Sequence, residues 1–326
     1  MSVPKKLFFR KILNKIIALL NLNKAVNILN NSVSDLRLEN IKTREDIDTL
    51  KLLLSKILIQ NNLIIDCTHN IQKAEFKVYS QWGDDGIIQY IINKIDFKTK
   101  TFIELGVQNY TESNTRFLLL NNNWSGLVID GSKDDIKYIQ SDPIYWKYDL
   151  KAIECFITKS NINNIIEAAE FKGDIGILSI DIDGNDYWIW KTITIIKPTL
   201  VIIEFNAVFG IDRPLTIPYS DNFIRENAHF SNLYYGASLS ALVKLGREKG
   251  YSFIGTNSAS VNAYFIKTEH LDNFKQKYVQ EVFSISKFSE SRDKNYNLNY
   301  LSYEESRNCI RGLPMFNVDK EMVELF

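Results

Sequence analysis

The sequence predicts an α/β fold, in which a doubly wound parallel sheet ends in an antiparallel hairpin and is preceded by an N-terminal helical segment. From residue 78 onward, short apolar runs alternate with helical patterns, as in parallel sheets whose crossovers are helices. The last two apolar runs are joined by a turn that is too short for a crossover, so they must be antiparallel. A sustained seven-residue apolar repeat before residue 70 predicts the helical segment.

The first 70 residues contain no glycine and one proline, Pro4, so nothing interrupts a helix there. Ten of twelve heptad positions are apolar, with a positions Leu19, Val26, Val33, Asn40, Ile47 and Leu54, and d positions Leu22, Leu29, Leu36, Thr43, Leu50 and Ile57. This repeat predicts a coiled coil that makes the protein a homo-oligomer, with Asn40 fixing register and oligomer state. The alternative is one or two amphipathic helices that pack on the following domain. The basic stretch from Lys5 to Leu13 is either a peripheral membrane contact or a solvated helix start.

After residue 78 the expected strands are 101–105, 126–130, 144–148, 175–180, 199–205, 251–255 and 261–266. The expected helices are 87–95, 113–120, 134–140, 163–171 and 238–249. The strand 175–180 is largely apolar, as a strand buried on both faces should be, and Gly250 ends the last helix. The chain therefore divides into an N-terminal helical segment (1–70), an α/β catalytic domain (71–267) and a helical or irregular extension (268–326).

Charge and cysteine usage exclude several classes of protein. The 39 basic and 39 acidic residues give a formal net charge of +0, which predicts no binding to nucleic acid. Cys67, Cys155 and Cys309 lie far apart without a CxxC motif, so neither a disulfide framework nor a zinc site is expected. The default location is a reducing cytoplasm. We expect no apolar run of membrane-spanning length and no signal peptide.

Four acids stand at or just past the ends of predicted strands: Glu104, Asp130, Asp181 and Glu204. In an open parallel sheet, ligands bind beyond the carboxyl ends of the strands. Asp130 can accept hydrogen bonds from both hydroxyls of a ribose. The turn after the first strand has one glycine, Gly106, where a dinucleotide site uses three. This pattern favours a ligand with a ribose and no phosphate, such as S-adenosylmethionine; the alternative is that the acids cap helices.

Five blocks of the sequence carry a resemblance to a known family. They are YSQWGDDGII (79–88), FIELGVQNYTESNTRFLL (102–119), WSGLVIDGS (124–132), LSIDIDGNDYWIW (178–190) and VIIEFNAVFG (201–210). Together they resemble FkbM-like, S-adenosylmethionine-dependent methyltransferases over residues 78–267. The resemblance implies the class I methyltransferase fold and methylation of a sugar hydroxyl, on a nucleotide sugar or on a surface polysaccharide such as a capsule. The usual GxG of the first motif is reduced here to Gly106, and the heptad segment lies outside the resemblance.

The resemblance also implies a cofactor site. Its residues are Gln81, Glu104, Gly106, Ser113, Asn114, Asp130, Asp149 and Asp181. Asp130 matches the acid that holds the ribose, and Asp149 falls where the adenine is usually held. Ser113 and Asn114 lie where a helix N-terminus would meet the methionine carboxylate; the alternative for Ser113 is a plain N-cap.

Two predictions concern catalysis. Asp183, Glu204 and Asn206 follow neighbouring strands and offer oxygen ligands for Mg²⁺, which would lower the pKa of the attacking hydroxyl; the alternative is that they hold hydroxyls without a metal. His229 is one candidate for the general base and Asp183 is the other. His229 lies in the insert 209–236, which we expect to cover the mouth of the pocket.

Two other functions compete with a sugar O-methyltransferase. An NAD-linked oxidoreductase on the same kind of sheet lacks the expected glycine triad. A non-catalytic assembly protein, in which the coiled coil is the working part, would not need the acids at the strand ends.

Overall fold

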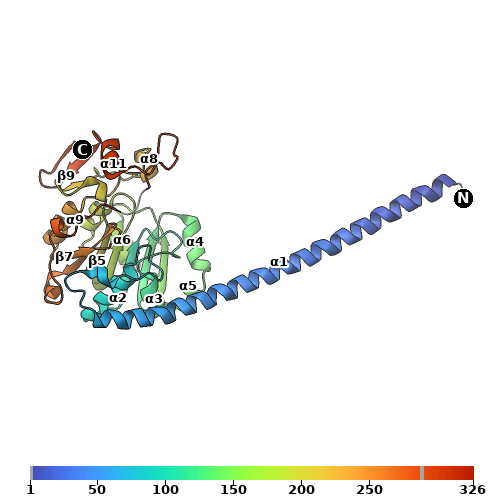
Figure 1. The fold of residues 1–326 in the computed structure, drawn as a ribbon, viewed down its shortest axis with the longest axis horizontal. Coiled ribbons are helices and arrows are strands. Elements are labelled where there is room, and N and C mark those ends of the chain that lie inside the picture. Colours follow the sequence, from blue (N-terminus) through green and yellow to red (C-terminus); the bar gives the residue numbers. More distant parts are fainter. Residues whose placement is uncertain (1–2, 287–289) are drawn as a thin grey trace. The chain divides into compact units, whose positions relative to one another are not determined.

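The computed structural model describes residues 3–286 and 290–326, with side chains from residue 8 onward. Its contacts divide the chain into Met1–Leu54 and Ser55–Phe326. The expected helical segment is one continuous helix, α1 (Val3–Ile64), so the boundary at Leu54 lies within it (Figure 1). The membrane-surface prediction for Lys5 to Leu13 lies partly outside the described side chains.

Between Phe8 and Ile64, α1 is long enough to cross a membrane, and one window reaches a mean hydropathy of 1.3. The expectation of no membrane-length apolar segment is therefore wrong. The sequence prediction failed because the many asparagines of this region break up the apolar runs, although they add no charge. Length and composition alone do not separate a membrane span from a helix that packs on protein.

Among the described residues, seven strands form one sheet in the order β3-β2-β1-β4-β5-β8-β7. The strands are β1 (Thr101–Leu105), β2 (Ser125–Asp130), β3 (Leu150–Glu154), β4 (Gly173–Ile180), β5 (Ile196–Glu204), β7 (Tyr251–Thr256) and β8 (Asn262–Lys267). Neighbouring strands from β3 to β5 pair in parallel, and β8 is antiparallel to both β5 and β7. The predicted fold class is confirmed, because this order with one reversed strand is the class I methyltransferase arrangement.

Helices cover both faces of the sheet (Figure 1). Successive side chains of a strand point to opposite faces, so Ile103 and Leu105 join one core and Phe102 joins the other. The first core is closed by α6 (Ile162–Ala168), α7 (Asp186–Thr192) and α9 (Leu239–Glu248). The second is closed by η1 (Ile71–Ala74), α2 (Asp84–Lys94), α3 (Arg116–Asn122), α4 (Lys133–Ser141) and α5 (Ile144–Lys147).

The third strand is not where the sequence predicted it. The expected strand 144–148 is the short helix α5, and β3 begins at Leu150. Pro143 stands at the start of this helix, and the Asp142 side chain accepts a hydrogen bond from the N–H of Ile144 at 3.0 Å. Proline at a helix start and an aspartate that caps the first turn both favour a helix. The apolar run Ile144–Tyr145–Trp146 therefore packs as a helical turn.

The C-terminal extension was expected to be helical or irregular, and this is wrong in part. It contains η3 (Thr268–Asn273), α10 (Val279–Val282) and α11 (Tyr303–Cys309), but also the strands β9 (Pro314–Asn317) and β10 (Met322–Leu325). In the described residues, β10, β9 and β6 (Leu215–Thr216) form a small antiparallel sheet. β6 belongs to the insert after β5, which also holds η2 (Ala207–Phe209) and α8 (Arg225–Ala228). The extension therefore supports the insert, with Leu215 and Met315 buried together.

Two adjacent buried acids fix the segment that leads to Gln81. One oxygen of Asp85 accepts hydrogen bonds from the N–H groups of Val78, Tyr79 and Ser80 at 2.7–2.8 Å. Asp84 turns the other way and binds side chains that include Asn257. Asp85 therefore holds residues 78–80, while Asp84 ties the start of α2 to the turn between β7 and β8.

Candidate functional site

A cavity of about 1000 Å³ lies at the carboxyl ends of β1, β2 and β4. Its lining comes from the segments that follow four strands and from the insert: 106–109 and 111–114 after β1, 130–132 after β2, 155–157 after β3, 181–183 and 185 after β4, and 223–226. This is the edge at which open parallel sheets bind ligands, and the chain reverses its strand order between β1 and β4. The structure brings together here seven of the predicted cofactor residues: Gln81, Glu104, Gly106, Ser113, Asn114, Asp130 and Asp181.

Gly106 allows the turn after β1 to pass directly against the end of β4. Its φ is +76°, and its N–H donates to the carbonyl oxygen of Ile129 at 2.9 Å. A Cβ atom at this position would lie 1.7 Å from the carbonyl oxygen of Asp181. Both the positive φ and the contact require glycine, so a single glycine meets the steric demand of this turn.

Glu104 is buried and holds the segment that leads into α3. One of its oxygens accepts from the N–H of Asn114 at 2.9 Å, and the other accepts from the N–H of Thr115 at 3.0 Å and from the Thr115 hydroxyl. Burial raises the pKa of Glu104, and these hydrogen bonds oppose the rise. The amides in front of α3 are therefore occupied by a side chain of the protein.

Ser113 matches the alternative prediction, which was a residue that caps the start of a helix. Its hydroxyl oxygen accepts from the N–H of Arg116 at 3.2 Å, in the first turn of α3. Because Glu104 already accepts from the N–H groups of Asn114 and Thr115, the segment 113–115 does not offer free N–H groups to a methionine carboxylate. The side chains of Ser113 and Asn114 still line the cavity, and the Asn114 amide donates to the Ser179 hydroxyl at 3.1 Å.

Asp130 stands at the end of β2, and its two carboxylate oxygens lie beside the segments that follow β1 and β2. One oxygen accepts from the N–H of Gln108 at 2.7 Å, and the other accepts from the N–H of Ser132 at 2.8 Å. Each carboxylate oxygen can accept a further hydrogen bond, and Asp130 is only half-buried. The two backbone amides hold the carboxylate in place, as a hydroxyl-binding acid requires.

Asp149 does not lie at the cavity. It precedes β3, and its carbonyl oxygen accepts from the N–H of Gly126 near the start of β2. Asp149 is therefore at the amino edge of the sheet, opposite to the site. The error follows from the misplaced third strand. The residues that do follow β3, Cys155, Phe156 and Ile157, line the cavity instead.

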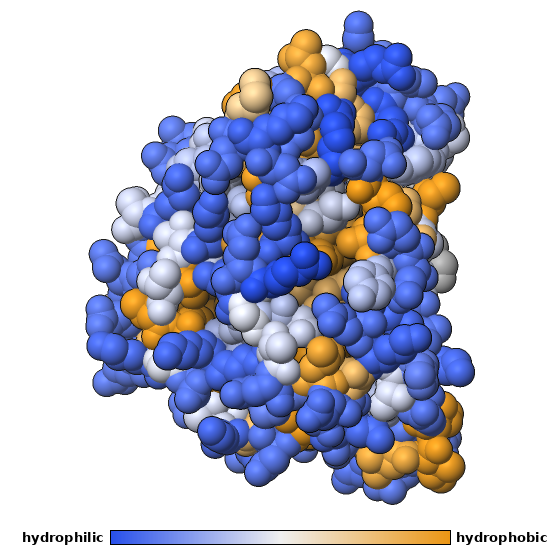
Figure 2. Space-filling model, turned by 90° about the vertical axis from the view of Figure 1, so that its left-hand side faces the viewer, coloured by the Kyte–Doolittle hydropathy of each residue, from blue (hydrophilic) through white to orange (hydrophobic). Residues whose placement is uncertain are grey.

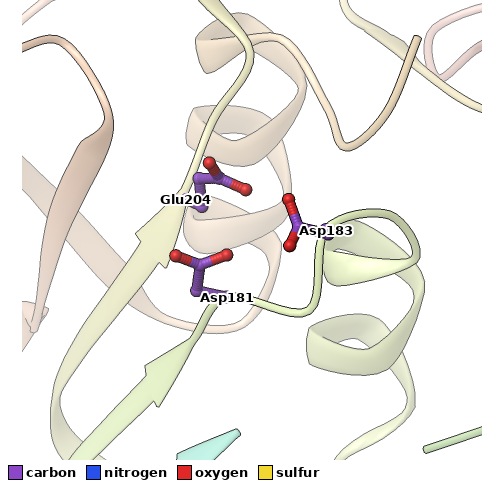
Figure 3. Close-up of side chains that lie close together, drawn as sticks. All are labelled: Asp181, Asp183 and Glu204. Carbon is purple, nitrogen blue, oxygen red and sulfur yellow. The ribbon is translucent and has the colours of Figure 1, made fainter. Parts of the chain in front are cut away.

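Asp181, Asp183 and Glu204 form an acidic cluster next to the cavity. One oxygen from each lies within 4.8 Å of the others, and Figure 3 shows the three carboxylates pointing toward one another from the ends of β4 and β5 and the loop before α7. Burial raises the pKa of both Asp181 and Glu204 well above ordinary values, and the neighbouring carboxylates raise it further. One oxygen of Glu204, Oε2, is buried and has no hydrogen-bond partner among the described residues. The cluster therefore needs a proton or a cation.

Arg225, from α8 in the insert, is a site residue that the sequence did not single out. Its guanidinium lies 2.5 Å from an Asp183 oxygen and 3.4 Å from a Glu290 oxygen, and stacks 3.9 Å from the centre of the Tyr235 ring. Its Nε donates to the carbonyl oxygen of Asn232. The insert covers the cavity as expected, and the signal that pointed to it was its position after β5.

Asn206 and His229 do not join the site. The Asn206 amide donates to the carbonyl oxygens of Leu233 and Tyr235, and its oxygen accepts from the N–H of Val208. Asn206 therefore ties the insert to β5, and Asp181 takes its place beside Asp183 and Glu204. The His229 ring lies 2.7 Å from the Ser231 hydroxyl and is not among the described residues that line the cavity. Burial lowers the pKa of His229.

No protein-family model matches this chain, and no curated protein matches it. Among solved structures, it is similar to the N-terminal domain of EvdMO1 with SAH bound, at 7% identity over 65% of this chain and 94% of that chain, with a TM-score of 0.37. It is also similar to an O-methyltransferase from Bacillus cereus in complex with SAH (11% identity, 64% and 90% covered, TM-score 0.37). A third is a putative caffeoyl-CoA O-methyltransferase from Staphylococcus aureus (15% identity, 67% and 99% covered, TM-score 0.37). Because these identities and TM-scores are low, the fold assignment rests on the strand order itself.

The close approach at Gly106 gives a prediction with a matched control. Gly173 also has a positive φ (+71°), but a Cβ there would meet no atom within 4 Å. Gly173→Ala should cost about 1 kcal/mol of unfolding free energy from backbone strain alone. Gly106→Ala should cost at least about 2 kcal/mol more, because the methyl group displaces the end of β4. Urea unfolding measures both; equal losses would show that the contact does not constrain the turn.

Proposed function

We propose that this chain is an S-adenosylmethionine-dependent O-methyltransferase. The observation that carries the proposal is the Glu104 carboxylate on the amides of Asn114 and Thr115. A dinucleotide places its pyrophosphate on the amides at this helix start, and a buried carboxylate there excludes it by occupancy and by charge. S-adenosylmethionine has a ribose and a positively charged sulfur but no phosphate. It fits a crevice with acids at the strand ends, and the NAD-linked alternative does not.

The residues at the cavity suggest how such a cofactor would be held. Asp130 would accept from the ribose hydroxyls, with its carboxylate already oriented by two backbone amides. The side chains of Gln81, Ser113 and Asn114 line the part of the cavity in front of α3, where the amino acid portion would lie. The acids that line the cavity at the strand ends, among them Asp130 and Asp183, would favour a sulfonium.

The bound cofactor would supply a methyl group attached to a positively charged sulfur. Transfer of that methyl group to a substrate hydroxyl, with the electrons of the broken carbon–sulfur bond left on sulfur, would require a base that takes the hydroxyl proton. We assign the base to Asp183, which lines the cavity and has half of its side chain exposed. Arg225 holds this carboxylate in position through its ion pair.

The acidic cluster also fits a divalent cation. Three carboxylate oxygens within 4.8 Å of one another match the oxygen ligands that Mg²⁺ prefers, and Glu204 has an oxygen without a partner among the described residues. We propose that one oxygen each of Asp181, Asp183 and Glu204 would bind Mg²⁺ and that this ion would hold neighbouring hydroxyls of the substrate. The second oxygen of Asp183 would then take the proton. The competing role for the cluster is to bind those hydroxyls directly.

A sugar is the substrate class that we propose, as a nucleotide sugar or as a surface glycan such as a capsular polysaccharide. The cavity is large enough for the cofactor and a second small molecule. Its lining is rich in acids and amides, which suit a polyhydroxylated substrate more than an apolar one. With Cys67, Cys155 and Cys309 all unpaired, we propose a cytoplasmic location, including the inner face of the membrane.

Cofactor choice can be tested by calorimetric titration of the purified protein with S-adenosylmethionine and with NAD⁺. We expect S-adenosylmethionine to bind and NAD⁺ not to bind. Asp130→Ala should weaken the binding of S-adenosylmethionine by roughly 1–3 kcal/mol, because the ribose hydroxyls lose their acceptor. The control is Asp134→Ala, an exposed acid on α4. Binding of neither nucleotide would support the non-catalytic assembly alternative.

Asp183→Asn should lower kcat by about 10²-fold or more, because the amide cannot accept the proton. Affinity for S-adenosylmethionine should change little. The comparison is His229→Gln, which should keep nearly full activity because His229 lies outside the cavity lining. A methyl-transfer assay with labelled cofactor and a panel of nucleotide sugars measures both variants. Loss of activity in His229→Gln alone would assign the base to His229.

Removal of divalent cations with a chelator tests whether methyl transfer needs Mg²⁺. EDTA should stop methyl transfer, added Mg²⁺ should restore it, and binding of S-adenosylmethionine should persist in the chelator because the proposed contact of Asp130 with the ribose needs no metal. Asp181→Asn should raise the Mg²⁺ concentration needed for half-maximal activity. Full turnover in EDTA would leave the cluster as a metal-free binder of hydroxyls.

A further inference from the structure

We propose that α1 pairs with α1 of a second copy of this chain as a parallel, in-register, two-stranded coiled coil. This inference is independent of the proposed function, because it rests on the seam of α1 and on the charges that flank it. The partner, its direction and its register each follow from a separate observation.

The heptad seam is an apolar line, interrupted at Asn40 and Thr43, that is open to a partner. Its ten apolar a and d side chains, from Leu19 to Ile57, are 39–63% exposed. Figure 2 shows, by contrast, one face of the molecule on which hydrophilic residues predominate and apolar ones gather in separate patches. Burial of one leucine side chain is worth roughly 1.5–3 kcal/mol. Repeated over this seam, that gain is large enough to drive association.

The last turns of α1 show which side of the helix is already used. Ser55 and Asn62, both at b positions of the heptad, are buried within the unit Ser55–Phe326. The Asn62 amide donates to the carbonyl oxygen of Ala74 at 2.7 Å. Ile57, at a d position, is 60% exposed. The helix therefore packs on its own chain through the b side, which leaves the a/d seam open.

Charges beside the seam select a parallel arrangement. The e positions Arg37, Arg44 and Lys51 are all basic, whereas the g positions Glu39 and Asp46 are both acidic. In a parallel pair, each g residue faces the e residue of the next heptad on the partner. Glu39 then meets the partner's Arg44, and Asp46 meets the partner's Lys51. An antiparallel pair would set e against e and g against g, which places like charges together.

Asn40 sets the register and the number of strands. It is the polar residue in the a series, and in the single helix its amide donates to the carbonyl oxygen of Leu36 at 3.1 Å. A buried asparagine at an a position is tolerated where it meets a second asparagine, which occurs in a two-stranded, in-register pair. A shifted register would bury Asn40 against an apolar side chain.

A lipid bilayer is the competing occupant of the apolar helix. The stretch from Asp35 to Lys51 carries nine charged side chains, which disfavours lipid around that half of the seam because burying charges in lipid is costly. Residues 16–34 carry only one charged side chain, Lys24, so the membrane alternative concerns the N-terminal half of the helix. A membrane span also gives no reason for e and g positions of opposite sign. These observations favour a second copy and leave membrane binding as an outcome of the test.

The charge pattern is tested on the full-length chain by sedimentation equilibrium. Glu39→Lys with Asp46→Lys makes both flanks basic and should weaken dimerisation roughly tenfold or more. Adding Arg44→Glu and Lys51→Glu should restore the wild-type dissociation constant, because the pairs are reformed with their signs exchanged. All four positions are on the exposed helix surface, and circular dichroism checks that the variants stay folded. A double variant that dimerises like wild type, or a quadruple variant that stays weak, would overturn the proposal.

Direction is tested by oxidative cross-linking at two d positions. Leu22→Cys and Leu50→Cys should each form disulfide-linked dimers with themselves. A mixture of the two variants should give no cross-link between position 22 of one chain and position 50 of the other. The wild-type chain controls for Cys67, Cys155 and Cys309. Mixed cross-links would indicate an antiparallel pair. A monomer that instead co-sediments with vesicles of phosphatidylcholine and phosphatidylglycerol would assign the seam to lipid.

Discussion

The carboxylate of Glu104 is the constraint on which the ligand chemistry of this fold depends. It lies between the end of β1 and the start of α3 and satisfies the amides of Asn114 and Thr115. These amides are where a parallel α/β sheet usually offers positive charge to a phosphate. By filling that position with a carboxylate, the chain leaves no free amides there for a phosphate, which is why we propose a ligand with a ribose and a positive charge. Gly106 agrees with this interpretation. The turn needs one glycine for its close contact with Asp181, and it lacks the further glycines that a pyrophosphate would need.

The acidic cluster and the insert depend on each other in a similar way. Asp181 and Glu204 are buried beside Asp183, and such a group of like charges is unfavourable unless it takes a proton or a positive charge. Arg225 brings part of that charge, and the insert that carries it is held by Asn206 and by the small sheet of β6, β9 and β10. The C-terminal strands therefore act on the site at a distance, because they support the segment that covers it.

The sequence predicted what depends on local pattern. Alternating apolar runs gave the sheet and its reversed strand, and acids at strand ends gave the cavity with Glu104, Asp130 and Asp181. It failed where non-local contacts decide. Asp149 was placed at the wrong edge because Pro143 turns an apolar run into a helix. The pairing of residues 314–317 with 215–216 joins segments far apart in the chain, and no local pattern reports it. Arg225 was missed because α8 is a single short helical turn, too short to show a periodic pattern in the sequence.

The N-terminal helix differs from the domain that follows in where it places its apolar side chains. In the unit Ser55–Phe326, apolar side chains alternate between the two faces of a sheet, and both faces are covered by the chain's own helices. In α1 the apolar line follows the heptad and is left exposed, while the buried positions Ser55 and Asn62 are polar. A chain that covers both faces of its sheet with its own helices, but leaves this line exposed and orders the charges beside it by sign, has a surface suited to an identical helix. The proposed association and the proposed catalysis thus depend on separate segments, so that either can be altered without the other.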